Sequence, residues 1–184
     1  MAVRKIVIGV LLAACTVPAA ASVVVLGTSD ARLCFEAADS PLMPQARDMQ
    51  RCNDALAVGS LSNYETVATH VNRGILRLRR GLSDEAIADF DAAMTLDPNQ
   101  PEAYLNKGAA LIRRENPAEA AQLFTMALEH NTQRPALAHY GRAVANEALG
   151  NVREAYQDYR MASQLAPHWS APRDDLQRFR VVQH

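Results

Sequence analysis

The side chains best suited to chemistry in this sequence are its five histidines, its three cysteines and a group of carboxylates within one short stretch. The histidines show neither an H-E-x-x-H spacing nor a Cys/His cluster of the kind that holds zinc, so we expect no metal site. Asp84, Glu85, Asp89 and Asp91 fall on one predicted helix, where they supply the negative charge of its first turn and a solvated face. Glycoside chemistry needs two carboxylates across a cleft, and this arrangement does not predict one.

Motifs for nucleophilic or phosphate chemistry are missing as well. The sequence contains no G-x-S-x-G and no G-x-x-x-x-G-K-[ST], so we expect no catalytic residue and no cofactor. Its charges are balanced, with 19 basic and 20 acidic residues. Without the first 21 residues, which hold Arg4 and Lys5 but no acid, 17 basic and 20 acidic residues remain. Nucleic-acid-binding domains carry a basic face, so we expect no nucleic-acid partner.

The N-terminus has the three parts of an export signal. Arg4 and Lys5 form a positive region, residues 6–17 are apolar, and residues 18–21 are Pro-Ala-Ala-Ala, a small-residue cleavage segment. The apolar stretch is shorter than the roughly 20 residues of a membrane-spanning helix. We therefore expect residues 1–21 to be a signal peptide, with Ser22 as the first residue of a periplasmic or secreted protein.

A second interpretation of the same residues stays open. The stretch Leu-Ala-Ala-Cys that ends at Cys15 resembles a bacterial lipobox, in which the cysteine is lipidated and becomes the new terminus. The apolar run before Cys15 is short, and the segment after it is apolar rather than polar. Lipidation would make the protein an outer-membrane lipoprotein, and it is the only route by which we expect membrane contact.

Two cysteines remain after Cys15. Cys34 and Cys52 form an even pair in a chain predicted to leave the cytoplasm, where disulfides persist. A bond between them would close a loop of about 18 residues and contribute about 3 kcal/mol. The alternative is a pair of buried free thiols, since cysteine packs as a small hydrophobe. We favour the disulfide.

The main feature of the remaining sequence is an internal repeat of about 34 residues. A small residue, an alanine, an aromatic residue, a second alanine and a closing residue recur in the same order. These are Gly74, Ala86, Phe90, Ala93 and Pro98, then Gly108, Ala120, Phe124, Ala127 and Thr132, then Ala143, Ala155, Tyr159, Ala162 and Pro167. Units of this length cannot bury their apolar faces alone, so they have to stack on one another.

Each unit is predicted to be two helices joined by a turn. In the first unit a helix runs from near Thr66 to Arg80, Gly81 suits the left-handed position at its end, and Ser83 caps the next helix. The same turn follows at residues 116–117 and 150–151. We also expect short helices over 31–38 and 45–57, and a C-terminal helix over 170–182 whose Leu176, Phe179 and Val182 face back onto the repeats.

The period, the A-x₃-F spacing and the closing proline resemble the tetratricopeptide-repeat family. The best-matched stretches are HVNRGILRLRRGLSDEAIADFDAAMTLDP and YLNKGAALIRRENPAEAAQLFTMALEH. The resemblance implies an all-α solenoid of helical hairpins wound into a right-handed superhelix. It places repeats at about 66–99, 100–134 and 135–167, an extended apolar lead-in followed by a degenerate capping helix pair within 22–65, and a capping helix within 168–184. His70 and His139 stand where the family has an aromatic residue, and we expect them to replace it in the packing.

The resemblance also implies a groove, lined by the first helix of each repeat, that holds an extended peptide. Asn72 and Asn106 occupy corresponding positions, and an amide offers a donor and an acceptor to any peptide backbone. The alternative is that both are ordinary solvated residues. The predicted peptide-binding residues are Val71, Asn72, Ile75, Leu78, Leu105, Asn106, Ala109, Ile112, Tyr140 and Val144, with Arg79 and Arg113 beside them.

Arg73, Lys107 and Arg142 form a second repeated series. We interpret them as partners of acidic residues such as Asp89 or Asp158 on the second helices; recognition of a ligand carboxylate is the alternative. The sequence as a whole indicates a non-catalytic scaffold that binds a protein or peptide in the bacterial cell envelope. Two alternatives are a lipid-anchored outer-membrane factor that recruits peptidoglycan or envelope-assembly enzymes, and a small hydrolase or ligand-binding module.

Overall fold

The computed structural model describes residues 21–25 and 29–179. Every regular element within these residues is an α-helix, and none of these helices is long and apolar enough to cross a bilayer. The helices are α1 (Ser29–Asp39), α2 (Ala46–Val58), α3 (Asn63–Arg79), α4 (Ser83–Leu96), α5 (Pro101–Arg113), α6 (Pro117–Glu129), α7 (Pro135–Ala148), α8 (Val152–Leu165) and α9 (Ala171–Leu176).

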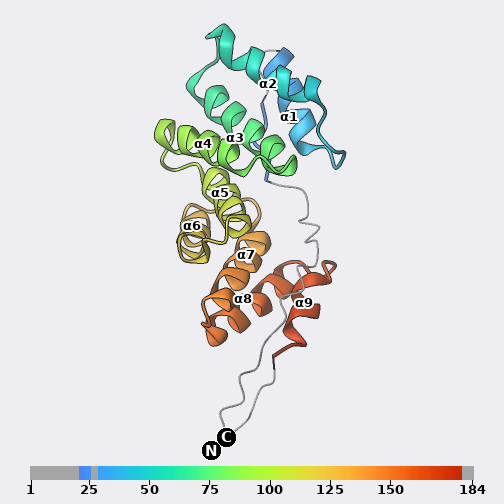
Figure 1. Cartoon of the computed structure of the whole chain (residues 1–184), viewed down its shortest axis with the longest axis vertical. Helices are drawn as coiled ribbons and strands as arrows, with labels where there is room; N and C mark the ends of the chain where they lie inside the picture. Colours follow the sequence, from blue (N-terminus) through green and yellow to red (C-terminus); the bar gives the residue numbers. More distant parts are fainter. Residues whose placement is uncertain (1–20, 26–28, 180–184) are drawn as a thin grey trace, which may run out of the picture.

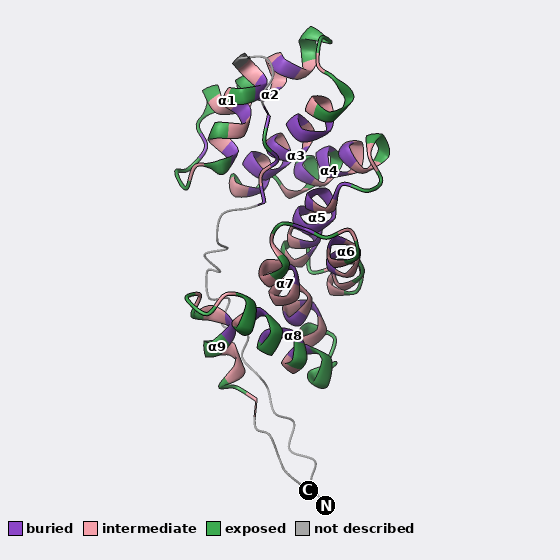
Figure 2. Cartoon of the chain, turned by 180° about the vertical axis from the view of Figure 1, so that it is seen from behind, coloured by how far each residue is buried: buried purple, intermediate pink, exposed green. Residues whose placement is uncertain are grey.

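The helices pack as consecutive hairpins in one elongated stack (Figure 1). The hairpins are α1 with α2, α3 with α4, α5 with α6 and α7 with α8, and α9 closes the stack against α8. The first helices also contact one another along the stack, α1 with α3, α3 with α5 and α5 with α7. Buried positions concentrate on α3 and α5, whereas α8 and α9 are more exposed (Figure 2). The fold is therefore the all-α solenoid of helical hairpins that the repeat predicts.

Three hairpin turns share one geometry with left-handed backbone at the same repeat position. Gly81 and Gly150 have φ of 80° and 79°, as their type favours, while Glu115 takes the same position with φ of 55°. The N–H of Leu82 bonds to the carbonyl of Arg77, five residues back, and closes the first of these turns. This tight closure leaves Leu82 as the N-cap of α4 and Ser83 inside the helix, so the prediction that Ser83 is the cap is wrong.

Glycines at helix contacts lie under aromatic rings. A Cβ at Gly74 would come within 2.5 Å of the ring of Phe90, and one at Gly108 within 3.0 Å of the ring of Phe124. Gly141 also lies against Phe124, where a Cβ would come within 2.3 Å of the ring. At Gly74, Gly108 and Gly141 a Cβ would therefore require the ring to move, because the ring of Phe90 or Phe124 occupies that space.

The two ends of the stack are closed differently. At the N-terminal end a disulfide joins Cys34 of α1 to Cys52 of α2. At the C-terminal end α9 stops at Leu176 rather than continuing to residue 182, and the three residues that follow bond to carbonyls only three positions back. Such bonds tighten the chain out of α geometry. Leu176 and Phe179 do pack against α7 and α8, while Val182 lies outside the described residues.

Candidate functional site

Two of the residues predicted to bind a peptide, Asn72 and Asn106, form hydrogen bonds with an N-terminal segment of the chain itself. Residues 21–25 run in an extended path alongside α3, where Figure 1 shows them as a short blue segment. Asn72 on α3 is fully buried and pairs with the main chain of Val23 through both ends of its carboxamide. Its Oδ1 accepts the N–H of Val23 at 2.9 Å, and its Nδ2 donates to the carbonyl of Val23 at 2.8 Å.

Two further side chains bond to the same segment. The Nδ2 of Asn106 on α5 donates to the carbonyl of Ala21 at 3.2 Å, and to the carbonyl of Glu102 in its own helix at 2.8 Å. The hydroxyl of Tyr64, at the start of α3, donates to the carbonyl of Val24 at 3.0 Å. The segment therefore crosses α5 and then α3, and polar side chains hold its main chain at three successive points.

The ten predicted peptide-binding residues fall into two groups. Those on α3 and the first half of α5 are buried by residues 21–25, by α1 or by their own helices, and those farther along the stack keep part of their surface. Ile75 and Leu78, for example, share one core cluster with Val23, Val25 and residues of α1. The buried group is Val71, Asn72, Ile75, Leu78, Leu105 and Asn106, and the half-buried group is Ala109, Ile112, Tyr140 and Val144.

The third repeat does not continue the asparagine series. In the register of Gly74, Gly108 and Ala143, the position of Asn72 and Asn106 is taken by Gly141, which lies against Phe124. The neighbouring Tyr140 contacts Trp169 and Tyr159, with ring centroids 4.6 and 5.6 Å away. Val144 packs with Leu176 and Phe179 at the C-terminal end. The amide pair is therefore confined to the part of the stack that the N-terminal segment occupies.

Two arginines expected beside the groove hold helix ends together. The guanidinium of Arg79 donates to the carbonyl of Ala38, in the last turn of α1, and to those of Ser40 and Leu42, in the connection that follows. Arg113 donates to the carbonyl of Leu78 near the end of α3 at 2.6 Å. Carbonyls at helix ends lack partners within the helix, and these arginines supply them. Both arginines therefore connect neighbouring helical hairpins, Arg79 the first and second and Arg113 the second and third.

The repeated cations pair with carboxylates of the second helices, as interpreted from the sequence. Arg73 binds Asp89 through Nε and Nη2, the latter at 2.7 Å, and Arg142 binds Asp158 in the same two-point manner at 2.8 Å. Lys107 departs from this pattern, since its Nζ reaches Asp91 at 2.7 Å and Glu119 at 3.6 Å. All three cations thus have carboxylate partners within the protein.

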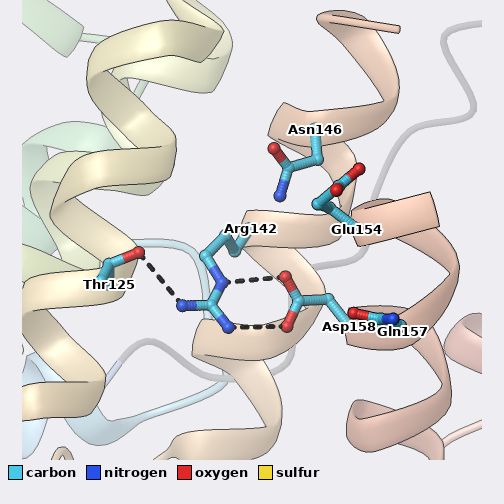
Figure 3. A pocket seen from close by; sticks show the side chains of 6 residues that line it. All are labelled: Thr125, Arg142, Asn146, Glu154, Gln157 and Asp158. Carbon is cyan, nitrogen blue, oxygen red and sulfur yellow. Dashed lines mark hydrogen bonds and ion pairs between the residues drawn. The ribbon is translucent and has the colours of Figure 1, made fainter. Parts of the chain in front are cut away.

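Each Arg–Asp pair includes a histidine from one turn earlier. The Nδ1 of His70 lies 3.1 Å from Asp89, and that of His139 lies 2.8 Å from Asp158. These histidines, which are expected to replace an aromatic ring in the packing, therefore also act as polar partners of a carboxylate. The second cluster opens onto a polar pocket of about 280 Å³, lined by Thr125, Arg142, Asn146, Glu154, Gln157 and Asp158 (Figure 3).

Burial and charge act in opposite directions on these two aspartates. Burial raises the pKa of Asp89, but hydrogen bonds from His70 and Arg73 and the charges of Arg73 and Arg77 outweigh it, so the pKa lies below its ordinary value of 3.8. The pKa of Asp158 is lowered in the same way, against its burial, by His139 and Arg142. Both carboxylates are therefore held ionised, as structural ion pairs.

A buried carboxylate that the sequence did not indicate is Glu102, in the first turn of α5. It accepts the hydroxyl of Thr132 and the N–H of Gln133, both at 2.9 Å, and so ties α5 to the connection before α7. Burial raises the pKa of Glu102, and these two hydrogen bonds offset only part of the effect. Thr132 stands where the other repeats have a closing proline, and this departure was the only available signal.

The other groups singled out for chemistry lie apart from one another. His130 stacks on Tyr104 at 5.4 Å, and His168 is exposed after α8. Within residues 21–25 and 29–179, no three His, Cys, Asp or Glu side chains gather as a metal site would require. Cys15, His184 and nearly all of the predicted signal peptide lie outside the described residues.

Comparison with known proteins found one matching family and solved structures with a similar fold. A model of the tetratricopeptide-repeat family matches residues 71–136 and 115–168. The first tetratricopeptide domain of Spaghetti (RPAP3), solved with the HSP90 peptide SRMEEVD, is 25% identical over 62% of this chain and 90% of that one, with a TM-score of 0.59. The first such domain of human RPAP3, solved by NMR, is 26% identical over 61% and 88%, with a TM-score of 0.58. No curated protein matches the chain. The two family matches together span more than half of the sequence, and the chain belongs to the tetratricopeptide-repeat family.

Proposed function

We propose that this protein is a non-catalytic scaffold that holds an extended segment of a protein partner against the face formed by α3, α5 and α7. The observation that carries the proposal is the contact of Asn72. A fully buried amide whose donor and acceptor both bind the main chain of one extended residue is a peptide-binding device, because it makes no demand on that residue's side chain.

Two other observations support this assignment. The related domain of Spaghetti (RPAP3) was solved with a bound peptide, so the same arrangement of helices can serve as a peptide-binding surface. Asp89 and Asp158, with His70 and His139, are used in ion pairs that join the two helices of one repeat. Tetratricopeptide domains are typically interaction modules, and these pairs give the polar side chains a structural purpose.

We place the scaffold in the bacterial cell envelope. The charged, apolar and small-residue parts of residues 1–21 support export, and the disulfide between Cys34 and Cys52 suits an oxidising compartment. Lipidation at Cys15 remains the alternative N-terminus. Globomycin, which blocks lipoprotein processing, separates the two: accumulation of the precursor indicates the lipoprotein, and unchanged processing indicates an ordinary signal peptide.

A site-specific photo-crosslinker tests the binding face. Benzoylphenylalanine in place of Ile112, half-buried on α5, is expected to give discrete adducts with another protein on illumination of intact cells. The matched control is the same substitution at Met161, which is exposed on α8, a helix that packs against α7 and α9. An absence of adducts from position 112, or the same adducts from both positions, would contradict the proposed function.

A further inference from the structure

We propose that residues 21–25 are an intramolecular ligand of the peptide-binding face, and that a partner peptide must displace them to reach Asn72 and Asn106. The partner segment is extended and carries small or β-branched residues at alternate positions. This inference rests on the proposed function and specifies the chemistry of the partner.

The first argument comes from the side chains of the segment. Ala21, Val23 and Val25 point inward and are at most 7% exposed, whereas Val24 between them is 50% exposed. Alternation with a period of two is the signature of an extended strand with one buried face. Together with the main-chain bonds to Asn72, Asn106 and Tyr64, it gives residues 21–25 the properties of a bound peptide.

The second argument concerns what holds the segment in place. Its main chain belongs to no helix or sheet, and the bonds that fix it to α3 and α5 come from the side chains of Asn72, Asn106 and Tyr64. Departure of the segment therefore breaks no helical backbone bond. The segment's other contacts include a hydrogen bond from the hydroxyl of Ser22 to Asp39 and the packing of Val23 and Val25 in the core. A segment held by side chains alone opens at lower free energy than a packed helix, which also loses its backbone bonds.

The third argument is the state that departure would leave behind. Asn72 is fully buried, and without Val23 both ends of its carboxamide lose their partners. An unsatisfied buried amide costs about 1–3 kcal/mol. A second peptide main chain in the same register restores both bonds, and small or β-branched side chains fit the space of Ala21, Val23 and Val25. The site thus favours exchange of one peptide for another over an empty state.

The series of asparagines has the same extent as the segment. Asn72 and Asn106 bond to residues 23 and 21, and the third repeat has Gly141 at that position. Both amides are therefore bound to the chain's own main chain, and the third repeat supplies no further asparagine at that position for a second peptide. The predicted N-terminus at Cys15 keeps the whole segment, whereas the one at Ser22 keeps Val23, Val25 and both bonds to Asn72 but lacks Ala21 and its bond to Asn106.

The experiment displaces residues 21–25 without changing the residues of α3 and α5 that bind them. The variant Val23→Asp places a carboxylate at an inward position, and the matched control Val24→Asp places one at the exposed neighbour. The probe is a fluorescein-labelled synthetic peptide, Ala-Ser-Val-Val-Val, with capped ends, and the readout is fluorescence polarisation with the exported, naturally processed protein. We expect the probe to bind Val23→Asp about ten-fold or more tightly than the wild type or Val24→Asp, because the apparent affinity scales with the fraction of open sites.

Two further arms make the result specific. Adding Asn72→Ala to Val23→Asp should remove binding of the probe, and a probe with aspartate at its third position should not bind. If circular dichroism shows that Val23→Asp unfolds, the wild type decides: an excess of unlabelled probe should speed the hydrogen exchange of residues 22–25. Equal affinity of the probe for wild type and a folded Val23→Asp, or unchanged exchange, overturns the inference.

The outcomes are separable from those of the proposed function. Adducts from position 112 that Val23→Asp neither increases nor decreases would leave the scaffold standing and end the displacement proposal. Probe binding to Val23→Asp with no adducts from position 112 would show a segment that closes a site without a cellular partner.

Discussion

The carboxamide of Asn72 is joined to the main chain of Val23 by two hydrogen bonds, at 2.9 and 2.8 Å, across 49 positions of sequence. This pair fixes the register of the N-terminal segment on α3, because a shift by one residue would turn the buried valines outward. It also makes Asn72 a structural residue as well as a candidate binding residue. Loss of partner binding on its substitution is therefore not evidence of direct contact by itself.

We expect Asn72→Ala to lower the free energy of unfolding by about 1–3 kcal/mol, because the N–H and carbonyl of Val23 lose their partners in a buried site. Asn106→Ala should cost less, because Asn106 makes one bond to the segment, at 3.2 Å, and its second partner is a carbonyl of its own helix. Urea unfolding followed by circular dichroism measures both variants. Equal losses of stability in the two variants would show that the pair of hydrogen bonds between Asn72 and Val23 contributes no more than the single bond of Asn106.

The ring of Phe90 leaves no space for a side chain at the position of Gly74. We expect Gly74→Ala to destabilise the protein by about 1–3 kcal/mol, although alanine is the better helix former, because the new Cβ would lie 2.5 Å from the ring. Gly108→Ala, with a 3.0 Å approach to Phe124, should cost less. Phe90→Leu provides the control in a double-mutant cycle, since a smaller side chain should remove most of the penalty. Additive effects of the two changes would contradict the steric explanation.

Features that recur in each repeat could be predicted from the sequence. Features that depend on a single contact between residues far apart in the chain could not. The helical hairpins and the Arg73–Asp89 and Arg142–Asp158 pairs follow from a spacing that recurs. Nothing in the composition of residues 21–25 distinguishes a groove occupant from an apolar lead-in, because its partner Asn72 lies far along the chain. Glu102 was missed for a similar reason: a carboxylate in a first helical turn is usually solvated, and Thr132 that buries it lies 30 residues away.

Glu115 holds a left-handed conformation, φ 55°, at the turn position where Gly81 and Gly150 stand in the other repeats. For a residue with a Cβ this conformation costs about 1 kcal/mol, and glycine adopts it freely. We expect Glu115→Gly to raise the free energy of unfolding by up to about 1 kcal/mol, measured by urea unfolding. The control is Glu115→Ala, which keeps the Cβ and removes the charge. A gain from alanine equal to that from glycine would assign the effect to charge instead.

Asp89 should contribute more to stability than its neighbour Asp91. Asp89 is 2% exposed and binds Arg73 and Arg77, so Asp89→Asn leaves two half-buried cations without their carboxylate and should cost about 3 kcal/mol or more. Asp91→Asn, which removes a half-exposed partner of Lys107, should cost about 1 kcal/mol or less. Chemical denaturation at neutral pH measures both. Similar losses would contradict the ranking by burial.

The same aspartates predict how the protein responds to acid. The pKa values of Asp89 and Asp158 in the folded protein lie below 3.8, so the unfolded chain binds their protons more readily. Their contribution is present above that pH and is lost as the pH falls through the lowered values. Glu102 acts in the opposite direction. Its folded pKa lies above 4.5, so the folded state binds the proton more tightly, and ionisation of Glu102 costs stability as the pH rises above 4.5.

We therefore expect the free energy of unfolding to rise as the pH is lowered through the raised pKa of Glu102 towards 4.5, and to fall once the pH drops below 3.8. Glu102→Gln removes the titrating group. It should therefore abolish the gain in stability on lowering the pH towards 4.5 and leave the loss of stability below pH 3.8 unchanged. The comparison uses slopes against pH, so it holds even if the substitution changes the overall stability by losing one of the bonds from Thr132 or Gln133. Urea unfolding at half-unit pH steps gives the slope of stability against pH above 4.5 and below 3.8. If the slope above pH 4.5 is unchanged in Glu102→Gln, burial of this carboxylate does not control the stability of the protein in that range.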